Sequence, residues 1–80
     1  MSVKTKVIDA VEDYCRKNKV RKISKRKAYE IAFDRIGSTF APEQRAVTQF
    51  LKLRKQVFSV RKNEIEYKGH FDEDGTHGVM

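Results

Sequence analysis

The spacing of apolar residues changes partway along this chain of 80 residues, and this change constrains its fold most strongly. Through residue 51, apolar side chains recur three and four positions apart, which is the period of a helix with one buried face. From residue 58 to residue 67 they alternate with polar ones, which is the period of a strand. The sequence therefore predicts an α+β fold in which helices precede a C-terminal β-hairpin.

Three helices are predicted in the first part of the chain. Residues 3–18 carry a single apolar stripe and predict the first helix. Ser24 is a good N-cap for the second helix, which we expect to extend to residue 36, and Gly37 can end it in a left-handed conformation. After a short turn, Pro42 suits the first position of a third helix, because a proline there loses no helical hydrogen bond.

The strand predictions rest on shorter patterns. Residues 20–23 alternate apolar and basic side chains, which fits either a very short strand or an extended connector. A two-residue turn at residues 62–63 is typical of a hairpin, although a four-residue loop stays an alternative. The two-residue turn predicts these cross-strand pairs: Val60 with Ile65, Phe58 with Tyr67, and Arg61 with Glu64.

Length and charge divide the chain into one domain and a tail. Residues 1–71 are expected to form a single small domain with a modest core of about 3–5 kcal/mol net stability. A second copy could support such a core, so homodimerisation stays open. Residues 72–80 show no periodicity and are predicted to be a disordered acidic tail. The whole chain has a net charge of +7, but residues 1–71 carry 18 basic against 8 acidic residues.

Cysteine content and hydropathy bear on location. The single cysteine, Cys15, cannot form an intramolecular disulfide, and its position on the first apolar stripe predicts a buried core residue. No apolar run is long enough to cross a bilayer, and the start of the chain does not resemble a signal peptide. We therefore expect an intracellular protein without a membrane partner, in the cytoplasm or nucleoid, or in a host cell if the protein is viral.

A dense run of cations without any acid points to an anionic partner. It comprises Arg16, Lys17, Lys19, Arg21, Lys22, Lys25, Arg26 and Lys27. The last three fall in the first turn of the second predicted helix, where the helix dipole is already positive and each exposed cation costs roughly 0.3–1 kcal/mol. A bound phosphate would reverse this penalty. Nucleic acid is the leading partner, and the alternatives are an acidic protein, an anionic membrane surface or a merely solvated charge run.

Three helices followed by a basic-tipped hairpin, with a short strand between the first two helices, resemble the winged helix-turn-helix superfamily. The most specific pieces are the turn over residues 37–42 and the hairpin over residues 58–67. The resemblance implies a three-helix winged fold. It also implies that the third helix enters the DNA major groove, that the start of the second helix touches phosphates, and that the hairpin wing reaches the DNA backbone or minor groove.

Individual residues suit these implied roles. The resemblance implies base-reading side chains at Arg45, Thr48, Gln49 and Lys52. The candidate phosphate-binding residues are Arg21, Lys22, Lys25, Arg26, Lys27, Arg61, Lys62 and Lys68. The alternatives are an ordinary solvated helix face and edge-strand charges that prevent aggregation.

Signals for catalysis are weak. His70 and His77 flank three acids in a polar segment, which is far more typical of a solvated tail than of a metal site. No catalytic motif or phosphate-binding glycine loop occurs, so we expect no enzyme, no cofactor and no metal. The sequence predicts a small DNA-binding protein, a transcriptional regulator of viral or prokaryotic origin. A module that grips an acidic surface of a host or polymerase protein, and a binder of structured RNA, are the alternatives.

Overall fold

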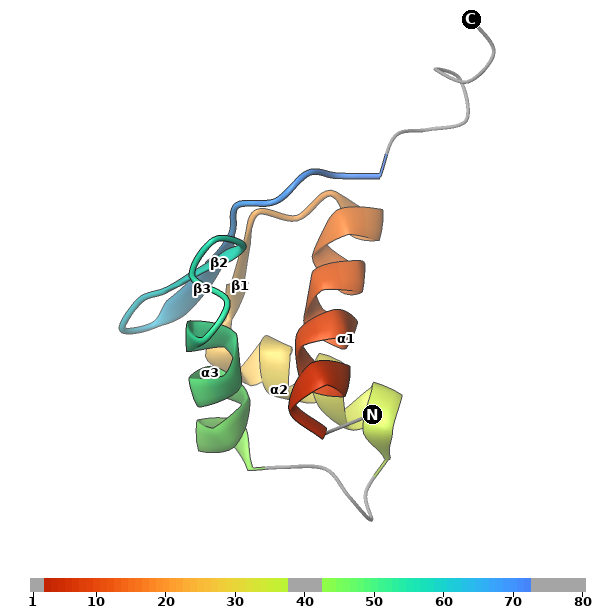
Figure 1. Ribbon diagram of the computed structural model, residues 1–80, viewed down its shortest axis with the longest axis vertical. Helices are drawn as coiled ribbons and strands as arrows, with labels where there is room; N and C mark the ends of the chain where they lie inside the picture. Colours follow the sequence, from red (N-terminus) through yellow and green to blue (C-terminus); the bar gives the residue numbers. More distant parts are fainter. Residues whose placement is uncertain (1–2, 38–42, 73–80) are drawn as a thin grey trace, which may run out of the picture.

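Three helices and three short strands make up the part of the chain that the computed structural model describes, residues 3–37 and 43–72 (Figure 1). In chain order they are α1 (Val3–Asn18), β1 (Lys22–Ser24), α2 (Lys25–Ile36), α3 (Gln44–Lys52), β2 (Phe58–Val60) and β3 (Glu64–Tyr67). The predicted α+β class is confirmed, and this layout is compatible with a winged helix. None of the helices in these ranges is long and apolar enough to span a membrane.

The ends of α2 follow local chemistry that the sequence predicted. The Ser24 hydroxyl accepts a hydrogen bond of 2.9 Å from the Lys27 N–H, which caps the first turn. At the other end, Gly37 has a φ of 92°, and its N–H donates to the Phe33 carbonyl at 2.8 Å. A positive φ favours glycine, so Gly37 ends the helix as expected.

The third helix begins later than predicted. Glu43, with a ψ of 160°, is the N-cap, and its carbonyl accepts the helical hydrogen bond from the Val47 N–H at 3.0 Å. Because the N-cap residue is not itself helical, α3 starts at Gln44 rather than at Pro42. Pro42 and the predicted turn before it lie outside the described residues.

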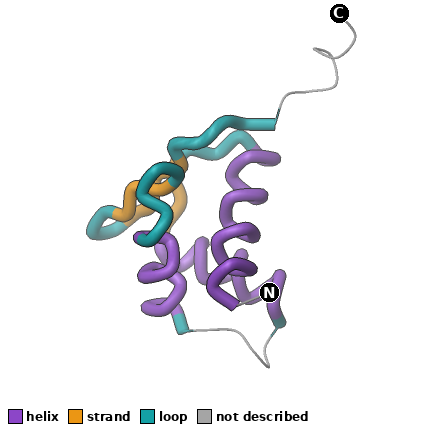
Figure 2. The backbone as a smooth tube through the Cα atoms, in the orientation of Figure 1, coloured by secondary structure: helices purple, strands orange, loops and turns teal. Residues whose placement is uncertain are grey.

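The hairpin register is confirmed. Phe58 pairs with Tyr67 and Val60 with Ile65, and the Arg61 N–H donates to the Glu64 carbonyl at 2.8 Å, as a two-residue turn requires. The strand order is β1-β3-β2, with every pairing antiparallel. Figure 2 shows the strands, in orange, gathered on one side of the helices. The hairpin is thus part of a three-stranded sheet rather than an isolated ribbon.

Strand β1 begins two residues later than the alternating pattern suggested, at residue 22 and not at residue 20. The Val20 N–H donates to the Cys15 carbonyl at 3.0 Å, and Lys19 adopts a φ of 57°. Both features belong to the turn that ends α1, so Val20 is part of this turn and not of the strand. The strand then pairs Ile23 with Ile65 of β3.

The core lies where the helices meet one face of the sheet. Buried apolar side chains come from every element: Val7, Val11 and Cys15 of α1, Ile23 of β1, Ala28 and Ala32 of α2, Val47 and Leu51 of α3, and Phe58, Ile65 and Tyr67 of the hairpin. The prediction for Cys15 is confirmed, since it is 1% exposed. Burial raises the pKa of its thiol to about 11.

The segment after β3 runs back to the C-terminal end of α1. The Asp72 N–H donates to the Arg16 carbonyl at 3.0 Å, and the Asp72 carboxylate lies 2.8 Å from Arg16 Nε. The ordered contacts therefore include Asp72, the first residue of the predicted tail. Residues 73–80 lie outside the described residues.

Candidate nucleic-acid interface

The outward side of α3 meets the first turn of α2 in one shallow hollow. Three of its lining side chains, Arg45, Gln49 and Lys52, are exposed residues of α3. Lys25, the first residue of α2, lines the same hollow of about 300 Å³. The structure thus brings three of the predicted base-reading residues beside one predicted phosphate-binding residue.

Thr48, the fourth predicted base-reading residue, lies on the border of the core. Its side chain is 8% exposed, and its hydroxyl donates to the Gln44 carbonyl one turn earlier at 3.1 Å. Thr48 is next to Val47 and three residues before Leu51, both fully buried, so it falls at the edge of the buried stripe. It lines the hollow, but its hydroxyl is already bonded within α3.

The three cations of the first α2 turn face different surroundings. Arg26 Nε lies 3.5 Å from the Glu30 carboxylate, one turn along the same helix. The Lys27 ammonium lies 5.1 Å from the centre of the Tyr14 ring, between α1 and α2. Lys25 is the member of this trio that joins the α3 surface.

Arg21 is exposed, but its side chain is engaged in contacts with the segment that follows β3. Its Nη1 donates to the Tyr67 carbonyl at 3.1 Å and to the Gly69 carbonyl at 2.6 Å. Its guanidinium also stacks 4.0 Å from the centre of the Phe71 ring. These contacts hold the segment after β3, so the structure gives the Arg21 side chain an internal role in place of a free cation.

Two candidate phosphate-binding residues, Arg61 and Lys22, form ion pairs with acids of the hairpin. Arg61 Nη2 lies 3.0 Å from Glu66 Oε1, and Lys22 Nζ lies 3.7 Å from Glu64 Oε2. Lys62 at the turn and Lys68 after β3 are exposed. Within the described residues, neither of these two lysines forms an ion pair.

A second hollow of about 320 Å³ adjoins the first, and Lys52 lines both. Lys55, just after α3, and Lys68, just after β3, converge on it beside Ser59. Lys55 was not among the candidate residues from the sequence. It lies in the turn after α3, so a helical spacing from Lys52 does not apply, and only the folded chain brings it beside Lys68.

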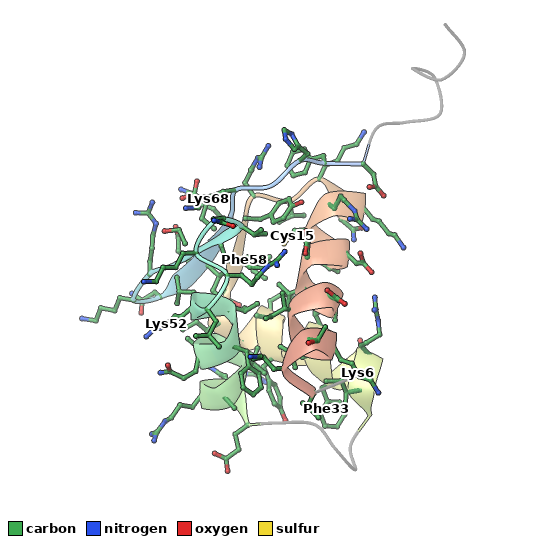
Figure 3. All side chains as sticks on the ribbon, in the orientation of Figure 1. Lys6, Cys15, Phe33, Lys52, Phe58 and Lys68 are labelled. Carbon is green, nitrogen blue, oxygen red and sulfur yellow. The ribbon has the colours of Figure 1, made fainter. Side chains whose placement is uncertain are left out.

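These residues form one surface, which we call the basic face. Its members are Lys25, Arg45, Gln49, Lys52, Lys55 and Lys68. Within the described ranges, none of its five cations has an acidic partner, whereas Arg16, Arg26, Arg35, Arg54 and Arg61 all do. Figure 3 shows Lys52 and Lys68 on the side of the molecule that carries the sheet, away from Lys6.

The described residues offer little for metal chemistry. No group of three or more His, Cys, Asp or Glu side chains in residues 3–37 and 43–72 is arranged to hold a metal ion. His77, part of the weak metal pattern, lies outside these ranges. The raised thiol pKa of Cys15 keeps it protonated at neutral pH, and a protonated thiol is a poor nucleophile.

Comparison of the chain with protein-family models, with curated proteins and with solved structures finds no match. The geometry and charge of the basic face are therefore the basis for inferring a function.

Proposed function

We propose that this protein binds double-stranded DNA through the basic face and acts as a small transcriptional regulator of the winged-helix type. In this proposal α3 enters the major groove. Lys25 at the start of α2 and the lysines near the wing contact phosphates on either side. The observation that carries the proposal is the convergence, from α2, α3 and the end of β3, of cations that have no acidic partner within the described residues.

The distribution of charge supports a polyanionic ligand. Glu12, Asp13 and Glu66 pair with arginines outside the basic face, and no described acid forms an ion pair with a cation of this face. Repulsion among neighbouring cations is then offset only by solvent, salt or a bound anion. A nucleic acid offsets it best, because phosphates are closely spaced and binding releases condensed counterions.

A helix such as α3 can enter the major groove. With side chains an α-helix is about 10–12 Å across, and the groove is about 12 Å wide. Arg45 and Gln49 are one turn apart on the exposed side, so their ends can reach neighbouring base pairs. Arginine suits the acceptors of guanine, and glutamine suits the donor and acceptor of adenine.

The test is fluorescence anisotropy with a labelled random-sequence DNA duplex across a salt series. We expect affinity to fall steeply with salt. Lys55→Ala should reduce the slope of log K against log salt by about one unit, as expected for one lost phosphate contact. Lys6→Ala is the matched control, because Lys6 is an exposed lysine of α1 away from the basic face, and its slope should match the wild type (Figure 3).

Competition separates the proposal from its alternatives. A duplex RNA that displaces the DNA at lower concentration would assign the face to RNA. No binding of either nucleic acid at low salt would contradict the proposal and favour an acidic protein surface as the ligand.

A further inference from the structure

The outer side of α2 carries a hollow of a different character. Tyr29 and Phe33 form its walls, with ring centres 5.9 Å apart and ring planes inclined at 47°. Glu30 and Asp34 complete the lining, which is mostly carbon. Phe33 is 37% exposed, and it is the one aromatic residue among the large exposed apolar residues of the described ranges.

The pattern of burial along α2 explains why this ring is not in the core. Ala28 and Ala32 are fully buried, and they let α2 pack closely against its neighbours. Tyr29 and Phe33 each follow one of these alanines, so their rings lie one position further around the helix. Tyr29 still packs against the edge of the core, whereas Phe33 faces outward.

The charge of this hollow is opposite to that of the molecule. Its two charged lining residues, Glu30 and Asp34, are both acids, on a chain with a net charge of +7. Glu30 is engaged by Arg26, but Asp34 makes no ion pair within the described residues. Glu30 and Asp34 also line the neighbouring hollow between α1 and α2, where Lys17, Lys27 and Arg35 accompany them. Both hollows of the basic face contain lysines.

We propose that this hollow accepts an arginine side chain from an apolar segment of a partner protein. A guanidinium can stack on the aromatic rings and donate hydrogen bonds to the Asp34 carboxylate. The apolar neighbours of that arginine would cover the exposed Phe33 ring. The volume, about 230 Å³, lies below the range of typical small-molecule pockets and suits one side chain.

The protein uses the same chemistry internally, where Arg21 stacks on Phe71 at 4.0 Å. Figure 3 shows Phe33 near the lower end of the molecule and Lys52 on the side that carries the sheet. No lining residue of this hollow belongs to the basic face, so a protein that binds DNA through that face would have a separate surface for a basic partner. This inference goes beyond the proposed function and does not depend on it.

The test is an NMR titration of the full-length protein with a short capped peptide that contains one arginine flanked by leucines. A second peptide replaces the arginine with citrulline, which keeps the shape and removes the charge. We expect saturable amide shifts centred on residues 29–34 with the arginine peptide and weaker binding of the citrulline peptide. Phe33→Ser and Asp34→Asn should each weaken binding of the arginine peptide about two- to fivefold.

Asp9→Asn is the matched control, because Asp9 is another exposed acid without an ion pair in the described residues, and it lies on α1. It should leave binding unchanged. Equal binding of the two peptides, equal loss in the Asp9 variant, or shifts confined to α3 would overturn the inference. Sedimentation of the free protein as a dimer that Phe33→Ser dissociates would also overturn it, because a second copy would then occupy the hollow.

Discussion

Arg21 holds the segment that follows β3 against the rest of the molecule. It was a candidate phosphate contact because it lies in the cationic run, and in the folded chain it bonds two carbonyls and stacks on Phe71. The Gly69 backbone lies close against the Tyr67 ring, since a Cβ at residue 69 would lie 2.5 Å from the Tyr67 hydroxyl oxygen. The contacts of Arg21 join residues 46 and 48 positions apart, which no local pattern reveals.

Replacing Arg21 with alanine should therefore affect stability more than binding. We expect the free energy of unfolding to fall by about 1–2 kcal/mol, from the loss of two charge-assisted hydrogen bonds and the stacking on Phe71. The salt slope for DNA binding should stay within about half a unit of the wild type. Urea denaturation and anisotropy measure the two quantities. Unchanged stability with a slope lowered by one unit would instead make Arg21 a phosphate contact.

Cys15 and Tyr67 give the stability a predictable dependence on alkaline pH. Burial raises the pKa of the Cys15 thiol from 9.0 to about 11, and burial, followed by the charge of Glu12, also raises the pKa of Tyr67. The unfolded chain then loses these protons at lower pH than the folded chain. Neither group should contribute a pH dependence below about pH 9. The contribution of Cys15 should reduce stability between pH 9 and 11, at up to about 1.4 kcal/mol per pH unit, and Tyr67 should add to this fall above pH 10.0.

Chemical denaturation at several pH values measures this effect. The Cys15→Ala variant has a lower stability at neutral pH, but its decline between pH 9 and 11 should be shallower than that of the wild type. An identical decline in both proteins would contradict a role for the buried thiol.

At the scale of elements, the predictions that succeeded rest on local chemistry. The 3.6-residue period, the Ser24 cap and Gly37 determine α1 and α2, and these are visible in the sequence. Strand β1 could not be located as reliably, because three residues carry little local signal and its pairing partner, β3, lies 40 residues away. The start of α3 was misjudged for a similar reason, since Pro42 is compatible with more than one position near a helix start.

Substitutions at Ser24 can separate the effect of the N-cap hydrogen bond on α2 from the effect of charge at the start of this helix. Ser24→Asp keeps a capping oxygen and adds a negative charge beside Lys25, in a first turn that has no acid. We expect stability to stay the same or rise by a few tenths of a kcal/mol, because the acid favours the helix dipole. DNA affinity should fall, since the charge opposes a bound phosphate.

Ser24→Asn is the control, because it keeps the cap and adds no charge. Thermal denaturation and anisotropy compare the two variants. Equal DNA affinity of the Asp and Asn variants would remove the α2 N-terminus from the proposed interface.

At the scale of the whole molecule, the sequence predicted an excess of positive charge but not its arrangement. Folding directs acids towards Arg16, Arg26, Arg54 and Arg61, and leaves the lysines near α3 without acidic partners in the described ranges. Lys55 joins Lys68 only because the loop after α3 returns beside the end of β3. The acidic aromatic hollow on α2 depends in the same way on which face of the helix is buried.

The most direct test of the central claim compares two variants of equal net charge. One changes Lys25, Lys55 and Lys68 of the basic face to alanine, and the other changes the exposed Lys4, Lys6 and Lys17 of α1. Anisotropy with duplex DNA across a salt series should show the slope lowered by up to about three units in the first variant and by less than one unit in the second. Equal losses in the two variants would mean that DNA responds only to net charge, and would contradict a defined nucleic-acid interface on the basic face.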